Sequence, residues 1–108
     1  MQTISVPLQN RSYPIWIEKG LLTNLPELLK PMNQGQKWVI FSQNEIISLY
    51  GNSLCKGLKS FGFQVELVTL PNGEKAKSLN ALDEIFSKLI GVGCDRSSTF
   101  LALGGGVV

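Results

Sequence analysis

Two short stretches of the sequence combine residue types that suit a phosphate-containing ligand. The first is "LGGGVV" at residues 103–108, where three consecutive glycines follow an apolar run. Glycine has no Cβ, so backbone N–H groups there can approach an anionic oxygen closely and form an anion-binding nest. This chemistry suits a pyrophosphate. The stretch is not G-x-G-x-x-G, however, and an ordinary turn is an equally good interpretation of the three glycines.

The second stretch, "PNGEKAK" at residues 71–77, places charged side chains after a turn. Glu74 could accept hydrogen bonds from both hydroxyls of a ribose, and Lys77 could neutralise a phosphate as a point charge. The alternative is a solvated turn whose charges stabilise the start of the following helix. A third stretch, "SQN" at residues 42–44, supplies amides for a ribose, with Gln43 as an approximate substitute for the acid of a dinucleotide fingerprint.

The composition removes several other kinds of site. The 108 residues include no histidine, so the chain cannot form a Ser-His or Cys-His catalytic pair. Cys55 and Cys94 are far apart in the sequence, belong to no C-x-x-C pair and make a poor zinc site, so we expect two small buried or half-buried side chains. Ten basic and eight acidic residues are scattered along the chain, which indicates neither a nucleic-acid-binding nor a membrane-binding surface.

The sequence gives no sign of membrane insertion or export. No stretch approaches the ~20 apolar residues of a membrane span, and the first ten residues lack a basic segment followed by an apolar one. A cytoplasmic location is therefore expected. With 44% hydrophobic residues the chain can form one core, and no linker, repeat or low-complexity tract divides it.

The elements that position these stretches follow from the hydrophobic pattern. Residues 3–8 and 13–18 alternate on either side of "QNRS" and predict a β-hairpin, in which Pro7 and Pro14 indicate edge strands or bulges. A short helix is expected after Gly20, because leucines recur there at helical spacing.

From Lys37 onward the pattern alternates between strands and helices. The predicted elements are residues 37–41 (strand), 44–62 (helix), 63–70 (strand), 78–93 (helix) and 98–103 (strand). Ser78 is expected to cap the second of these helices. Strands joined by such helices form a parallel sheet with right-handed crossovers, and their apolar runs require cover on both faces. The predicted fold class is therefore α/β: a three-layer, Rossmann-like parallel sheet flanked by helices, with the N-terminal hairpin attached to the same domain.

The three stretches with candidate chemistry all follow strands of this predicted sheet. Ligands of such sheets bind beyond the carboxyl ends of the strands. "FSQN", "LPNGEKAK" and "LGGGVV" stand at the three carboxyl ends. The sequence therefore predicts one binding site that all three stretches share.

These motifs together resemble those of a known enzyme family. "LPNGEKAKSLNALDEIFSKL" followed by "RSSTFLALGGGVV" is similar to the N-terminal nucleotide-binding domain of 3-dehydroquinate synthase, with its pattern L-P-x-G-E-x-x-K and then A-L-G-G-G-V-V-G-D. The opening "RSYPIWIEKG" also resembles the first hairpin of that family. The resemblance covers essentially all 108 residues and breaks off at Val108, where the family pattern continues with glycine and aspartate.

The resemblance implies a set of cofactor-binding residues. That family binds NAD through the G-E-x-x-K turn and the glycine loop. Carried onto this sequence, the cofactor contacts fall on Asn72, Gly73, Glu74, Lys75, Ala76, Lys77, Gly104, Gly105, Gly106, Val107, Val108 and Gln43. At the last of these positions such enzymes usually have asparagine or aspartate.

The resemblance also implies an activity. Enzymes of this family convert a seven-carbon keto-acid sugar phosphate into 3-dehydroquinate, in the shikimate route to aromatic amino acids, with NAD and a divalent metal (zinc or cobalt). Their metal ligands belong to a second, largely helical domain. Residues 1–108 would then be a truncated N-terminal NAD-binding domain, without catalytic or metal-binding residues and inactive alone, from an enzyme for which a homodimer is a candidate assembly.

Two alternatives remain open from the sequence. Other sugar phosphate cyclases and metal-dependent alcohol dehydrogenases share the nucleotide-binding half, so the substrate is not fixed by these motifs. A small non-enzymatic α/β module could also use the glycine stretch to bind an anion.

Overall fold

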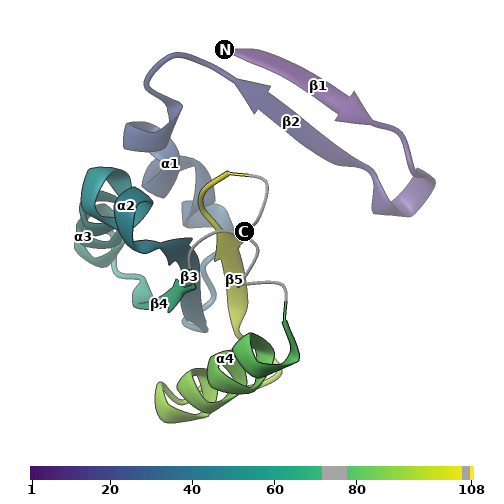
Figure 1. Cartoon of the computed structure of the whole chain (residues 1–108). Coiled ribbons are helices and arrows are strands. Elements are labelled where there is room, and N and C mark those ends of the chain that lie inside the picture. Colours follow the sequence, from purple (N-terminus) through teal and green to yellow (C-terminus); the bar gives the residue numbers. More distant parts are fainter. Residues whose placement is uncertain (72–77, 106–107) are drawn as a thin grey trace.

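The chain forms two separate β-sheets in its computed structural model, which describes residues 1–71, 78–105 and 108. The first sheet is an antiparallel hairpin of β1 (Gln2–Val6) and β2 (Tyr13–Ile17). Figure 1 shows this hairpin extending away from the rest of the chain. The prediction of an N-terminal hairpin is confirmed, and Pro14 is tolerated in β2 because both strands of a two-stranded sheet are edge strands.

The second sheet is parallel and contains three strands. They are β3 (Lys37–Gln43), β4 (Gln64–Leu70) and β5 (Thr99–Ala102), in the order β4-β3-β5. The central strand β3 pairs with both neighbours in parallel, which confirms the predicted topology.

The helical segments lie mainly between these strands. In chain order they are a 3₁₀ turn (Gln9–Arg11), α1 (Leu21–Leu29), a 3₁₀ turn (Lys30–Met32), α2 (Asn44–Ile46), a π-helical turn (Ile47–Gly51), α3 (Asn52–Ser60) and α4 (Leu79–Gly91). The start of α4 has the predicted cap, since the Ser78 hydroxyl accepts a hydrogen bond from the Ala81 N–H at 3.1 Å. No helix among the described residues is long and apolar enough to cross a membrane.

The helix predicted over residues 44–62 contains a wider π turn. Gly51 in this turn is buried, and a Cβ built on it would lie 3.3 Å from the side chain of Ile47. The backbone at this point is therefore packed against the preceding turn, as only a residue without a side chain readily allows. The predicted helix is therefore present as a continuous helical run over residues 44–60, and the π turn within it was not predicted.

The main core lies between one face of the parallel sheet and helices α1 and α3. Trp38 and Ile40 of β3 are 1% and 0% exposed, and the ring of Trp38 meets that of Phe63 edge to face at 5.1 Å. Leu54 and Leu58 of α3 complete this core from the helical side. Alternate residues of β3 thus face α1 and α3, as the period of a strand requires.

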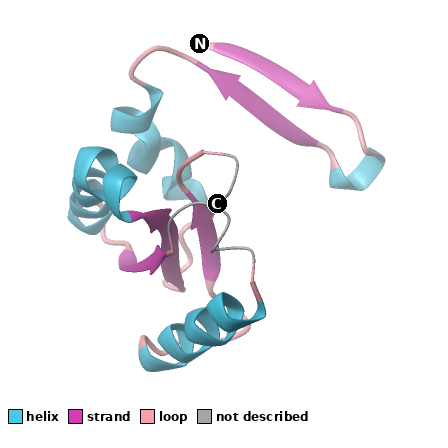
Figure 2. Cartoon of the chain, viewed as in Figure 1, coloured by secondary structure: helices cyan, strands magenta, loops and turns pink. Residues whose placement is uncertain are grey.

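Helix α4 covers the opposite face of the sheet, as Figure 2 shows. Val39, Val68 and Ala81 are buried on this side. The cover is thinner than predicted, because Phe86 of α4 and Phe100 of β5 are 55% and 54% exposed. The sheet therefore has helices on both faces, and among the described residues its α1–α3 face is the better packed.

Candidate functional site

The carboxyl ends of the three parallel strands lie at one edge of the sheet. Gln43 at the end of β3 pairs with Leu70 at the end of β4, and Phe41 pairs with Ala102 at the end of β5. The Leu103 N–H donates to the Phe41 carbonyl at 2.9 Å, so the pairing continues up to the glycines. The stretches predicted to bind the cofactor thus begin side by side.

This edge includes the topological switch point of the sheet. The connection from β3 runs to β4 through α3 on one face, whereas the connection from β4 returns across β3 to β5 through α4 on the other face. Open α/β sheets bind their ligands where the connections leave in opposite directions, and in this sheet that position lies between β3 and β5.

The chain bends after β5, and at Gly104 this bend leaves no room for a side chain. Gly104 has a φ of +152°, and a Cβ built on it would lie 2.7 Å from Cγ2 of Val108. The Val108 N–H donates to the Gly105 carbonyl at 3.2 Å. We call residues 104, 105 and 108 the glycine bend. Its backbone approaches neighbouring atoms more closely than a residue with a side chain permits.

Gln43 has a contact that the sequence did not predict. Its side-chain nitrogen Nε2 donates to the Pro71 carbonyl at 2.8 Å. This bond ties the end of β3 to the end of β4, at the point where the stretch 72–77 begins. The structure thus gives Gln43 a positioning role, and its contact with a cofactor stays a prediction.

The remaining predicted cofactor-binding residues lie outside the described part of the chain. They are Asn72, Gly73, Glu74, Lys75, Ala76, Lys77, Gly106 and Val107. Their contacts with a cofactor stay predictions. Of the twelve predicted positions the structure describes Gln43, Gly104, Gly105 and Val108, all at the same edge of the sheet.

Ser42 lies at the same edge, within the predicted stretch "FSQN" but not among the residues predicted to contact the cofactor. Its side chain is fully buried, and its hydroxyl has no hydrogen-bond partner among residues 1–71, 78–105 and 108. The oxygen lies 3.7 Å from the position that a Cβ would take on Gly104. A buried hydroxyl without a partner costs about 1–3 kcal/mol. The signal in the sequence was a polar residue on the strand face that also carries Trp38 and Ile40.

The described part of this edge offers backbone and hydroxyl groups and no cluster of metal-ligating side chains. Gly104 carries no side chain, and the Ser42 hydroxyl lies beside it without a hydrogen-bond partner among the described residues. Within the described residues no three His, Cys, Asp or Glu side chains gather as metal ligands. Cys55 and Cys94 are unpaired thiols, one buried and one half-buried, as predicted.

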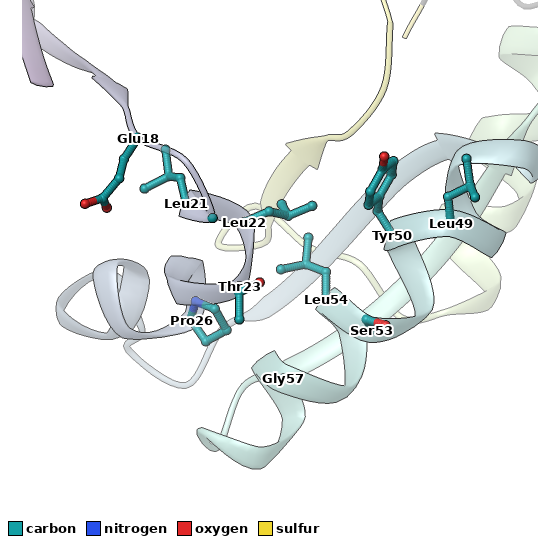
Figure 3. Close-up of a pocket in the computed structure, with 11 residues that line it drawn as sticks. Glu18, Leu21, Leu22, Thr23, Pro26, Leu49, Tyr50, Ser53, Leu54 and Gly57 are labelled. Carbon is teal, nitrogen blue, oxygen red and sulfur yellow. The ribbon is translucent and has the colours of Figure 1, made fainter. Parts of the chain in front are cut away.

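A separate pocket of about 660 Å³ opens between α1 and the segment that contains the π turn and α3. Figure 3 shows apolar side chains of α1, including Leu22 and Pro26, opposite Leu54 and Tyr50. Of the predicted cofactor-binding residues that the structure describes, none lines it. This pocket is therefore a different surface from the edge that carries the glycine bend.

The fold matches that of a solved enzyme structure. The crystal structure of a 2-deoxy-scyllo-inosose synthase superimposes on this chain with a TM-score of 0.81, over 98% of this chain and 30% of that chain. At 16% sequence identity the likeness shows the fold alone. The chain is thus an α/β unit of the kind that forms one part of that larger enzyme.

Sequence comparison gives the more specific relationship. A family model described as 3-dehydroquinate synthase N-terminal matches residues 67–108. The chain is 39% identical to the 3-dehydroquinate synthase of Syntrophotalea carbinolica over 99% of its length, and 41% identical to that of Prochlorococcus marinus subsp. pastoris over 97%. The enzyme of Clostridium acetobutylicum is 34% identical over 100% of this chain. The resemblance to 3-dehydroquinate synthase is therefore confirmed along the whole chain, which spans about 30% of the length of these relatives.

Proposed function

We propose that residues 1–108 are the N-terminal NAD-binding part of a 3-dehydroquinate synthase. The observation that carries this proposal is the similarity to 3-dehydroquinate synthases along the whole chain at 34–41% identity. The activity of the complete enzyme is then that of a lyase, which converts a seven-carbon keto-acid sugar phosphate into 3-dehydroquinate with loss of phosphate.

The role of this chain in that reaction is to bind and orient NAD. When bound, NAD would supply a hydride acceptor for a hydroxyl-bearing carbon of the substrate. The glycine bend provides backbone N–H groups beside the switch point, and a pyrophosphate bound there would displace the Val108 side chain, whose Cγ2 lies 2.7 Å from a Cβ built on Gly104. Glu74 and Lys77 are proposed to bind a ribose and a phosphate, respectively.

The metal and substrate chemistry is proposed to reside outside residues 1–108. The described residues gather no three metal-ligating side chains, and the whole chain has no histidine. The zinc or cobalt ion would polarise the reacting hydroxyl of the sugar phosphate from the other domain of the complete enzyme. A cytoplasmic location and a homodimer are further predictions of the same proposal.

A related cyclase is the alternative within the same fold. The fold likeness to a 2-deoxy-scyllo-inosose synthase does not separate the two, whereas the sequence identity is 16% for that enzyme and 34–41% for the 3-dehydroquinate synthases. The higher sequence identity to the 3-dehydroquinate synthases favours the reaction of those enzymes.

Assay of the complete protein with the seven-carbon keto-acid sugar phosphate tests the proposal. We expect stoichiometric release of phosphate and 3-dehydroquinate, dependent on added NAD after the cofactor has been removed. Absence of both products in a protein that binds NAD would contradict the proposed reaction and would favour another cyclase or a dehydrogenase.

A further inference from the structure

Helix α4 has two apolar sides, and the sheet covers only one of them. Ala81 is buried on the sheet side, and Ile85 and Leu89 follow it there at intervals of four residues and are half-buried. A second row of apolar side chains recurs at intervals of three and four residues, and its members are 44–84% exposed. We call this row the α4 stripe, and it consists of Leu79, Leu82, Phe86 and Ile90. A surface helix needs one apolar side, so the second indicates a further element packed against α4.

The strand that follows α4 has a free edge. Among the described strands, β5 pairs with β3 alone. The Leu103 N–H donates to β3, so by the alternation of an extended strand the N–H groups of Phe100 and Ala102 point away from β3. The four residues of β5 include no charged residue and no proline, which are the usual protection of an edge strand. This edge is therefore suited to pair with another strand.

Phe100 connects the free edge to the α4 side of the sheet. It pairs with Val39, which is buried on the α4 side, and its ring meets that of Phe41 edge to face at 5.0 Å. The ring is nevertheless 54% exposed. A parallel sheet needs cover on both faces, so the sheet is incomplete above Phe100 as well as beside it.

The topology of the sheet fixes the face on which a following helix would lie. The connection from β4 to β5 passes through α4 and crosses the sheet in the direction β4-β3-β5. A next parallel strand on the free edge of β5 would continue in that direction. Because crossovers between parallel strands are right-handed, two successive crossovers in one direction place their helices on the same face. The next helix would therefore lie on the α4 face, which is the face that carries the exposed ring of Phe100.

We propose that the α4 stripe, Phe100 and the free edge of β5 form a docking surface for the segment of the complete protein that follows Val108. This segment would supply a crossover helix that packs on the α4 face and a strand that pairs with β5 in parallel. The inference rests on the proposed function in one respect, because it takes residues 1–108 as part of a longer protein. The chain spans about 30% of the length of its 3-dehydroquinate synthase relatives, so most of their length lies outside it.

Hydrogen exchange followed by NMR on the complete protein tests the pairing of β5. We expect the amides of Phe100 and Ala102 to exchange as slowly as that of Leu101, whose N–H points toward β3 and is the internal control. Rapid exchange of Phe100 and Ala102 beside a protected Leu101 would overturn the inference. Protection that is lost on dilution of the protein would assign the edge to a second copy of the chain and would also overturn it.

Phe86→Ala in the complete protein tests the cover of the α4 stripe. If the following segment buries Phe86, the melting temperature should fall by about 5 °C or more, because a large side chain is removed from a packed interface. Glu84→Ala is the matched control, since Glu84 is also exposed on α4 but lies away from the stripe, and we expect it to melt as the wild type does. Equal melting temperatures of Phe86→Ala and the wild type would overturn the inference.

Both measurements are independent of the proposed reaction. Neither uses NAD or the sugar phosphate, so a protein that fails the activity assay can still show the protected edge and the sensitive stripe. Conversely, an active enzyme with an unprotected β5 edge would contradict this inference and leave the proposed function intact.

Discussion

Substitution of Glu74 distinguishes the two interpretations of residues 71–77, a cofactor-binding turn and a solvated turn. If it accepts hydrogen bonds from a ribose, Glu74→Gln in the complete protein should weaken NAD binding by about 1.5–3 kcal/mol and leave stability unchanged. If it only stabilises the start of α4, the same change should lower stability by about 0.3–1 kcal/mol with NAD affinity unchanged. NAD titration beside thermal melts of the empty protein distinguishes the two.

Lys77→Met provides the companion test for the phosphate. Loss of a cation near the cofactor should weaken NAD binding and reduce its dependence on salt concentration, because the lost attraction is screened by ions. NAD titrations of this variant at two salt concentrations measure both effects. Wild-type affinity at both concentrations would exclude Lys77 from the site.

Asp95 accepts hydrogen bonds in a turn before β5, and these bonds predict an acid-dependent contribution to stability. Its carboxylate accepts hydrogen bonds from the Ser97 hydroxyl at 2.7 Å and the Ser97 N–H at 2.9 Å. These bonds, the hydroxyl first, hold the pKa of Asp95 below its ordinary value of 3.8. Because the folded state has the lower pKa, the contribution of Asp95 to stability is present above pH 3.8 and is lost as the pH falls through the folded pKa.

The predicted consequence is a difference between two pH profiles. Between about pH 4 and pH 2, the wild-type protein should lose more free energy of unfolding than the Asp95→Ala variant does. The upper limit of this range follows from the pKa of a free aspartate. Denaturant unfolding at a series of pH values measures it. Parallel profiles for the two proteins would show that the turn contributes nothing through this carboxylate.

At the scale of elements, the approach of α1 to α3 depends on one glycine. A Cβ on Gly57 would lie 3.3 Å from Cγ of Pro26, so the two helices meet where α3 has no side chain. Gly57→Val should lower the free energy of unfolding by about 1–3 kcal/mol, the usual cost of overpacking. In the control Gly91→Val the added Cβ meets nothing within 4 Å, and no comparable loss is expected. Equal stabilities of the two variants would contradict this account of the contact.

Most elements could be predicted because their apolar residues repeat with a clear period. The hairpin, the three parallel strands and α4 with its Ser78 cap all follow from local pattern and turn chemistry. The π turn could not be predicted, because an apolar repeat does not report an extra residue in one turn, and the packing of Gly51 on Ile47 becomes visible only in three dimensions.

The candidate site was predictable to a similar extent. The three consecutive glycines are recognisable in the sequence, and the structure places Gly104 and Gly105 beyond the end of β5 as expected. Ser42 lies in the predicted stretch "FSQN", but the sequence did not single it out. A single serine in an apolar strand is common, and whether its hydroxyl has a partner depends on the surrounding fold. The bond from Gln43 to Pro71 likewise joins residues that are far apart in the sequence.

For the whole molecule, cofactor binding is proposed to reside in this chain and the remaining chemistry in other parts of the complete enzyme. The chain spans about 30% of the length of its 3-dehydroquinate synthase relatives. A polypeptide of residues 1–108 alone should therefore release no phosphate from the sugar phosphate substrate, even with NAD and zinc added. Turnover by the pure polypeptide above the buffer background would refute this division.

The central claim is that NAD binds at the carboxyl edge of the parallel sheet, against the glycine bend. An amide NMR titration of the complete, isotopically labelled protein with NAD tests it most directly. We predict that the signals of Ser42, Gly104 and Gly105 shift on addition of NAD, while those of Gln64 and Thr99 at the opposite edge of the sheet do not. Shifts confined to the pocket between α1 and α3, or no shifts at saturating NAD, would contradict the claim.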